Sequence, residues 1–166
     1  MKLKQVLGVV IAASAVATTS SAFAHTDMPH TSTPRFEPGR VEDTPFGQQG
    51  DPKKVTRTIR VTMDDSMRFH PENITVEQGE TVRFVIPNAG AVLHEMVLGT
   101  PEALKEHAEL MKKHPGMEHD EPSMAHVKPG TAGEIVWRFT KAGEFQFACL
   151  IPGHFEAGMV GKVRVR

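Results

Sequence analysis

Apolar and polar side chains alternate along much of the chain between residue 59 and the C-terminus. Successive side chains of an extended strand point to opposite faces, so such runs predict strands with one buried face. The alternating runs cover residues 59–63, 74–76, 82–86, 94–98, 135–139, 145–149 and 159–165. Glycine or proline separates several of them, as at Gly79, Pro129 and Gly130. This pattern predicts an all-β fold, an antiparallel β-sandwich.

One helix is expected between the strands. Thr100 is a suitable N-cap, Pro101 suits the first helical position, and Glu102 places a negative charge in the first turn. Pro115 and Gly116 end the helical pattern. Because strands of a sandwich are normally joined by shorter turns, we interpret the helix and residues 115–130 as an insertion.

The insertion is rich in histidine and methionine. These residues are His107, Met111, His114, Met117, His119, Met124 and His126. Imidazole and thioether groups together suit copper, so the segment from His107 to His126 is a candidate for a weak extra copper site. The alternative is that these residues bind no metal, with Met111 on the buried face of the helix and the histidines on polar loops.

The only cysteine of the chain begins a short segment with three metal-binding side chains. Cys149 is followed by His154 and Met159 at five-residue intervals, and Pro152 and Gly153 lie between them. Thiolate, imidazole and thioether together suit copper in both of its oxidation states. Taken alone, Cys149 could instead be a small core residue or pair with another chain. The order of the donors and the turn residues between them favour a metal site.

A fourth donor comes from a different strand. His94 lies 55 residues before Cys149 and has the same parity as Met96 and Leu98, so it faces the same side as these apolar residues. A buried histidine bonded only to protein groups would be the ordinary interpretation. The Cys149 segment makes metal binding the better one, and the donors together form a His2Cys set with an additional methionine.

The chain from Val55 to the C-terminus resembles the cupredoxins, the plastocyanin and azurin family of type 1 copper proteins. The resemblance rests on His94, Cys149, His154 and Met159, and the spacing from cysteine to histidine is similar to that in azurin. It implies a Greek-key β-sandwich with copper at one end. It also implies a strong bond from Cys149, equatorial nitrogens from both histidines, and a weak axial contact from Met159.

Two further features follow from the resemblance. The second histidine of the family, here His154, reaches the surface beside an apolar patch, for which Ile151, Pro152 and Phe155 are suited. The sequence departs from the family at Glu95, where many cupredoxins have an asparagine directly after the first histidine. Neighbouring hydrogen bonds tune such sites, so the colour and the reduction potential cannot be carried over from relatives.

The N-terminus carries an export signal. Residues 1–24 combine two lysines, an apolar run too short to span a bilayer and a small-residue cleavage pattern, which predicts a secretory signal peptide cleaved before His25. Cleavage leaves 17 basic and 20 acidic residues, a formal charge of −3, without a basic patch for nucleic acid. We therefore expect a periplasmic protein with no membrane span after cleavage.

Residues 25–54 are rich in proline, glycine and threonine and show no apolar period, so we expect a mostly disordered tail before a cupredoxin domain at 55–166. After cleavage, His25 would be the N-terminal residue, with Met28 and His30 close by. These residues are either a weak secondary copper site or part of a polar tail without that role.

These observations predict a non-enzymatic, monomeric copper protein with a redox-active type 1 centre, acting in copper homeostasis. The chain is most similar to periplasmic cupredoxins associated with bacterial copper resistance, and the extra histidines and methionines agree with that role. The alternative is an electron carrier between periplasmic redox partners. A cuprous oxidase is the third possibility, although the chain has one domain and lacks the His-x-His pairs of multicopper enzymes.

Overall fold

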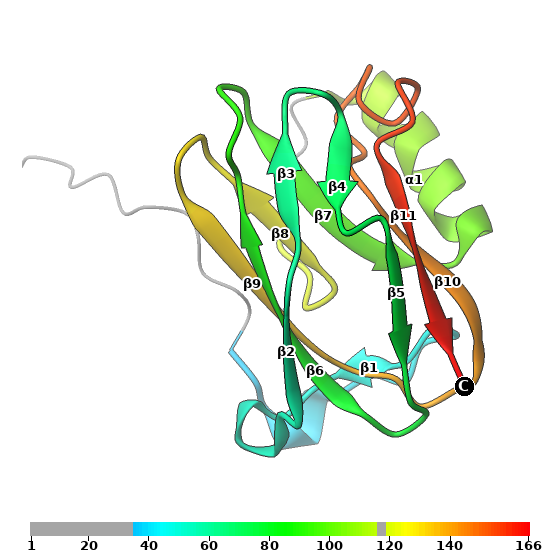
Figure 1. Cartoon of the computed structure of the whole chain (residues 1–166). Coiled ribbons are helices and arrows are strands. Elements are labelled where there is room, and N and C mark those ends of the chain that lie inside the picture. Colours follow the sequence, from blue (N-terminus) through cyan, green and yellow to red (C-terminus); the bar gives the residue numbers. More distant parts are fainter. Residues whose placement is uncertain (1–34, 116–118) are drawn as a thin grey trace, which may run out of the picture.

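Two sheets packed face to face form the protein (Figure 1). The computed structural model describes residues 35–115 and 119–166. One sheet has the strand order β1-β9-β6-β2 and the other β5-β11-β10-β7-β8, while β3 and β4 form a separate hairpin. The strands are β1 (Gln48–Gln49), β2 (Arg57–Arg60), β3 (Thr62–Asp64), β4 (Arg68–His70), β5 (Asn73–Val76), β6 (Thr81–Pro87), β7 (His94–Gly99), β8 (Met124–Val127), β9 (Ala132–Arg138), β10 (Gly143–Ala148) and β11 (Val160–Val165). The predicted all-β sandwich with a helical insertion is confirmed.

Two strand pairs differ from the antiparallel expectation. Strands β2 and β6 pair in parallel, and so do β5 and β11. The chain leaves β2, forms the β3–β4 hairpin, contributes β5 to the opposite sheet and only then returns as β6. Because this connection passes through the other layer, β6 runs in the same direction as β2. The alternating pattern predicts which face of a strand is buried, but it carries no information on strand direction.

The core between the sheets is built by the alternating positions. In β6, for example, Val82, Phe84 and Ile86 are fully buried, as the sequence pattern predicts. Aromatic rings contribute much of the core: Phe84 packs edge-on against Phe139, with ring centroids 6.2 Å apart. Such pairs stabilise a core by about 0.5–1.5 kcal/mol beyond the area they bury.

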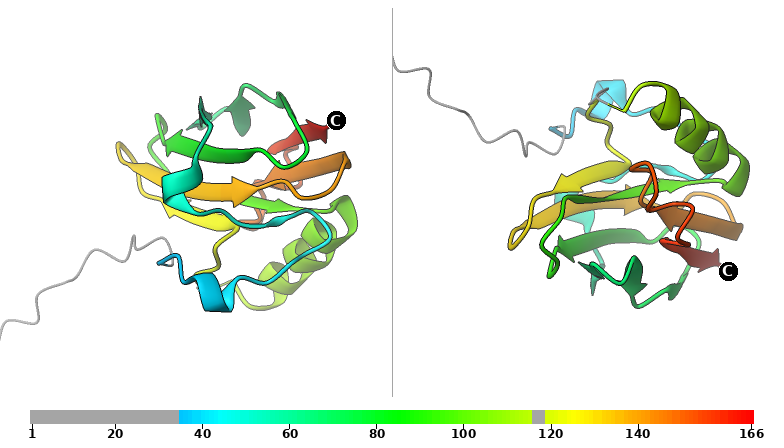
Figure 2. Two further views of the ribbon diagram at one scale, coloured as in Figure 1. Left: turned by 90° about the horizontal axis from the view of Figure 1, so that it is seen from below. Right: turned by 90° about the horizontal axis from the view of Figure 1, so that it is seen from above.

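Helix α1 (Pro101–Lys113) covers the outer face of the five-stranded sheet (Figure 2). The Thr100 side chain accepts a hydrogen bond from the Ala103 N–H at 3.2 Å, as expected for an N-cap. The buried side of the helix belongs to a second apolar cluster, which contains Val97, Leu104, Ala108, Met111, Met124, Ala148 and Leu150. Strand β7 is therefore buried on both faces.

The segment before β2 is ordered where the sequence predicted disorder. Two 3₁₀ turns, η1 (Pro38–Arg40) and η2 (Pro52–Lys54), flank β1, which pairs antiparallel with β9. The Phe46 ring stacks on Trp137 with centroids 5.1 Å apart, and the Trp137 indole N–H donates to the Phe46 carbonyl oxygen at 3.0 Å. Strand pairing, this ring stack and this hydrogen bond together attach a segment that has no apolar period, and the predicted disorder is wrong for residues 44–54.

Several predictions concern residues outside the described part of the chain. The signal peptide at 1–24 and the possible copper ligands His25, Met28 and His30 belong to this group, as does Met117. In the described part, no helix is long and apolar enough to cross a membrane.

Candidate metal centre

Three of the four predicted ligands lie where strands of one sheet begin or end. His94 is the first residue of β7, Cys149 directly follows β10, and Met159 directly precedes β11. Strand β10 is paired with both β7 and β11, so these positions are neighbours in the sheet. His154 lies in the turn between β10 and β11, at the end of the sandwich opposite the C-terminus (Figure 1).

Three of the four side chains converge. The Cys149 Sγ and His154 Nδ1 atoms are 3.3 Å apart, and the rings of His94 and His154 have centroids 4.9 Å apart. One potential ligand atom from each of the three residues lies within 4.8 Å of the other two. Residues that are 55 positions apart in the sequence therefore meet at one point, with the donor types that copper prefers.

Met159 is held against the same loop through its backbone. Its N–H donates to the His154 carbonyl oxygen at 3.1 Å, and its own carbonyl oxygen accepts from the Cys149 N–H at 3.1 Å. The Met159 side chain is fully buried and belongs to the same apolar cluster as Cys149. These bonds close the segment from Cys149 to Met159 into a compact loop, which brings the three predicted ligands on this loop close together.

His94 has one ring nitrogen that no protein group satisfies. Its side chain is 0% exposed, and its Nε2 lies 3.2 Å from the Asp65 carboxylate. Because a carboxylate only accepts hydrogen bonds, Nε2 carries the proton and Nδ1 has a free lone pair. The buried Nδ1 makes no hydrogen bond. A buried polar atom without a partner costs about 1–3 kcal/mol, and a metal bond would remove that cost.

Asp65 orients this histidine and was missed by the sequence analysis. It lies in the turn between β3 and β4 and also accepts a hydrogen bond from the Ala91 N–H at 2.7 Å. It therefore joins the β3–β4 turn to the loop that leads into His94. A β-carbon on Gly90 would collide with the Asp65 carboxylate, so any larger residue at position 90 would displace the side chain that orients His94. The run Asp64, Asp65, Ser66 signals a turn, but no local pattern predicts a contact with a residue 29 positions away.

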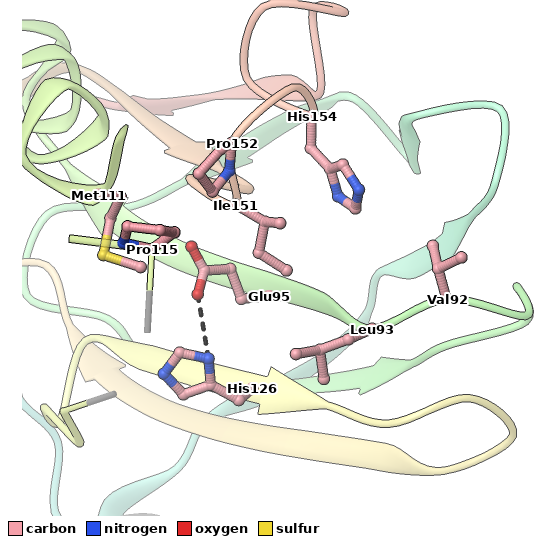
Figure 3. Close-up of a pocket in the computed structure, with 9 residues that line it drawn as sticks. All are labelled: Val92, Leu93, Glu95, Met111, Pro115, His126, Ile151, Pro152 and His154. Atoms are coloured by element: carbon pink, nitrogen blue, oxygen red, sulfur yellow. Dashed lines mark ion pairs between the residues drawn. The ribbon is translucent and has the colours of Figure 1, made fainter. Parts of the chain in front are cut away.

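Glu95, the residue that departs from the family pattern, lies under the metal loop. It is 1% exposed, and its Oε1 accepts a hydrogen bond from the Leu150 N–H at 2.8 Å. Its Oε2 lies 3.0 Å from His126 Nδ1 (Figure 3). Hydrogen bonding to this carboxylate raises the pKa of His126. One buried carboxylate therefore links the metal loop to the insertion.

The sulfur of Cys149 is enclosed by protein. Burial, and after it the Glu95 carboxylate, raise the pKa of the Cys149 thiol to about 12, while hydrogen bonds from the backbone of Glu95 and Ile151 act in the opposite direction. Without a metal the sulfur is therefore a protonated thiol, and metal binding would replace this proton. The side chain is 0% exposed, which is unsuited to a disulfide with another chain.

His154 is suited to bind a metal as a neutral ring. Burial, followed by the neighbouring His94, lowers its pKa. Neutral imidazole is the form that coordinates metals, so this environment favours the ligand state. The donor set of two imidazoles, one thiol and one nearby thioether fits copper.

A cavity of about 270 Å³ opens beside His154. Figure 3 shows its lining, which consists of Val92, Leu93, Glu95, Met111, Pro115, His126, Ile151, Pro152 and His154. Val92 and Leu93 are 43% and 39% exposed, which gives this end of the molecule an apolar surface. Ile151 and Pro152 contribute to this surface as expected. Phe155 does not line the cavity and packs against the cluster under α1.

The methionines of the insertion are core residues where the structure describes them. Met111 and Met124 are buried in the cluster under α1, which agrees with the structural interpretation of Met111. His114 is exposed. The histidines at 107, 119 and 126 lie close to one another.

Fold and site together define a copper protein with a cysteine and two histidines at one end of a β-sandwich. The family model described as copper binding proteins, plastocyanin/azurin family, matches residues 55–166. The chain belongs to this family of copper-binding proteins. The match agrees with the convergence of His94, Cys149 and His154, and copper is the metal that this site binds.

Curated relatives are similar over most of their length. The chain is 56% identical over 124 residues to the copper-resistant cuproprotein CopI of Rubrivivax gelatinosus, which covers 75% of each chain. It is 36% identical over 150 residues to the protein of the same name from Pseudomonas aeruginosa, covering 73% of this chain and 82% of that protein.

Solved structures show the same fold. Auracyanin B has a TM-score of 0.59 at 22% identity, covering 75% of this chain and 99% of auracyanin B. The reduced auracyanin of Roseiflexus castenholzii has a TM-score of 0.58 at 20% identity, covering 68% of this chain and 98% of that protein.

Proposed function

We propose that the chain is a periplasmic copper-tolerance protein with one redox-active type 1 copper centre, bound by His94, Cys149, His154 and Met159. The observation that carries this proposal is the buried, unpartnered Nδ1 of His94, a residue whose ring contributes one atom to a 4.8 Å cluster with Cys149 and His154. The two curated relatives compared above are named copper-resistant cuproproteins, which supports a role in tolerance.

The protein groups around the site favour a fixed ligand geometry. Bound copper would supply a one-electron change between Cu(II) and Cu(I). Asp65 fixes the His94 ring, and Glu95 fixes the backbone that follows Cys149. Because ligands and neighbouring groups are held by sheet elements, we expect them to move little between the two oxidation states.

The test of the ligand set is the spectrum of the Cu(II)-loaded protein. We expect Cys149→Ser to abolish the intense thiolate-to-copper charge-transfer band, and Met159→Leu to shift it while copper remains bound. Met124→Leu is a matched control, because Met124 is also buried but lies in the cluster under α1. A Cys149→Ser protein that keeps the band would refute the assignment.

An electron carrier is the second candidate, favoured by the exposed Val92 and Leu93 beside His154. Such a surface suits brief docking of a periplasmic redox or copper-handling partner. Deletion of the gene separates the two roles. Copper sensitivity with normal respiration is expected for tolerance, whereas a respiratory defect at low copper would favour the carrier.

We further propose that the protein does not turn over a substrate. The measurement is oxygen consumption after Cu(I) is added to the copper-loaded protein, and sustained consumption over many turnovers would instead indicate a cuprous oxidase. The proposed location is tested by cell fractionation and by the mass of the mature chain, which should begin at His25.

A further inference from the structure

Two histidines of the insertion form a close pair outside the type 1 ligand set. His107 lies on α1, and His119 lies in the segment between α1 and β8. Their Nε2 atoms are 3.0 Å apart. Their rings are stacked, with centroids 4.9 Å apart and an angle of 22° between the planes. Two nitrogens at this separation can both reach one ion at a metal–nitrogen distance of about 2.0 Å, with about 100° between the bonds.

The surroundings of His107 favour its neutral ring. Burial, followed by the proximity of His119, lowers the pKa of His107. The second nitrogen of His119, Nδ1, is buried without a hydrogen bond and lies 3.5 Å from the Glu121 carboxylate. Neutral imidazole is the ligand form, so the environment of His107 favours metal binding.

A third histidine faces the same residue. His126, on β8, has its Nε2 3.3 Å from the His119 carbonyl oxygen. Its other nitrogen lies 3.0 Å from the Glu95 carboxylate, which fixes the ring orientation (Figure 3). A carboxylate that accepts from the remote nitrogen is the usual support of a metal-binding histidine. His126 can bind through Nε2 when the proton that Nε2 directs at the His119 carbonyl oxygen is released to solvent, while Nδ1 keeps the proton that faces Glu95.

We propose that His107, His119 and His126 bind a second copper ion, as Cu(II). The donors of this site are nitrogens, because Met111 and Met124 are packed in the core. Imidazole donors suit Cu(II), which also binds nitrogen sites more tightly than the other divalent metals of its row. This site goes beyond the proposed function, and it does not depend on the type 1 copper being redox-active.

Glu95 connects the proposed second site to the first. Its Oε2 contacts His126, while its Oε1 accepts from the Leu150 N–H beside Cys149. Glu95 is also the residue after His94 in β7. The two copper sites therefore share one buried carboxylate as a common neighbour.

The experiment counts copper in the full mature chain after loading with excess Cu(II) and removal of unbound metal. We expect the double variant His107→Ala, His119→Ala to hold one copper fewer per chain than the wild type and to lose a Cu(II) electron spin resonance signal with a large hyperfine splitting. The thiolate charge-transfer band should remain, which also reports that the variant is folded. Copper bound by residues 25–34 cancels in this comparison.

The matched control is His70→Ala. His70 also pairs with a carboxylate, Asp64, at 3.1 Å, but it lies on β4 and outside the cluster. We expect this variant to hold as much copper as the wild type. If the double variant holds the wild-type amount of copper and gives the same resonance signals, the second site does not exist.

A pulsed resonance measurement does not depend on the double variant folding. In the variant His25→Ala, His30→Ala, the second Cu(II) signal should show modulation from the remote nitrogens of at least two imidazole rings. A second signal without such modulation, or the absence of any signal besides the type 1 copper, would overturn the proposal.

Discussion

The Oε1 atom of Glu95 accepts a hydrogen bond from the backbone N–H of Leu150, with the two atoms 2.8 Å apart. This bond joins β7 to the residue that follows Cys149. The same strand begins with His94, so one strand both supplies a metal ligand and fixes the loop that carries the others. The residue that departs from the family pattern is thus part of the support of the metal site.

Replacing Glu95 with alanine should destabilise the copper-free protein by about 1–3 kcal/mol, because it leaves the buried Leu150 N–H and the His126 ring without their acceptor. Urea unfolding measures this difference. Glu144→Ala is the control, since Glu144 pairs with Arg164 at the surface, where both side chains are about 70% exposed. Exposed pairs contribute about 0–1 kcal/mol. Equal stabilities of the two variants would contradict the role of Glu95.

Replacing Asp65 with alanine should weaken copper binding about 10- to 100-fold, because the His94 ring loses the acceptor that fixes its orientation. A competition titration against a chelator gives the affinity. Asp43→Ala is the matched control, as Asp43 is an exposed carboxylate bonded to Lys141. We expect the control to bind copper as the wild type does, and an Asp65→Ala protein with that same affinity would refute this role.

The β3–β4 turn that carries Asp65 should weaken in acid. A hydrogen bond from the Ser66 side chain is the main cause of a lowered pKa at Asp64. A carboxylate with a lowered pKa stabilises the folded state above its unfolded pKa of about 3.9, and this contribution is lost as the pH falls through the folded value.

Urea unfolding of the wild type and of Asp64→Asn at several pH values tests this dependence. The wild type should be the more stable at neutral pH, and the difference should vanish in strong acid. Ser66→Ala should show a smaller acid-sensitive part, because the main cause of the shift is removed. A difference between wild type and Asp64→Asn that is the same at all pH values would contradict the explanation.

Replacing Phe46 with alanine should release the segment before β2. The half-buried ring covers Trp137, so we expect a loss of about 1–3 kcal/mol in the free energy of unfolding. Trp137 is the only tryptophan, and its fluorescence should shift to longer wavelength as water reaches the indole. Glu42→Ala, an exposed change in the same segment, is the control. An unchanged emission spectrum in Phe46→Ala would show that the stack is not maintained in solution.

Local patterns were sufficient for much of the fold and for the choice of ligands. The alternation of apolar and polar residues locates most core strands, because every second side chain of a strand such as β6 faces the core and is apolar. The donors at 149, 154 and 159 could be recognised because they lie in one loop, and His94 because it shares the parity of buried neighbours.

Contacts between distant segments could not be predicted in this way. The bond from Asp65 to His94 depends on the β3–β4 turn meeting the loop before β7, and the stack of Phe46 on Trp137 joins residues 91 positions apart. Neither contact leaves a periodic signal. The direction of β2 relative to β6 likewise depends on the path of the chain through the opposite sheet.

The enclosure of Cys149 protects its sulfur chemically while the protein is free of copper. A sulfur that is sealed from solvent and keeps its hydrogen is a poor target for oxidants and for foreign disulfides. The copper-free protein should therefore keep a reduced Cys149, both before copper first binds and after copper is lost, and so remain able to bind copper.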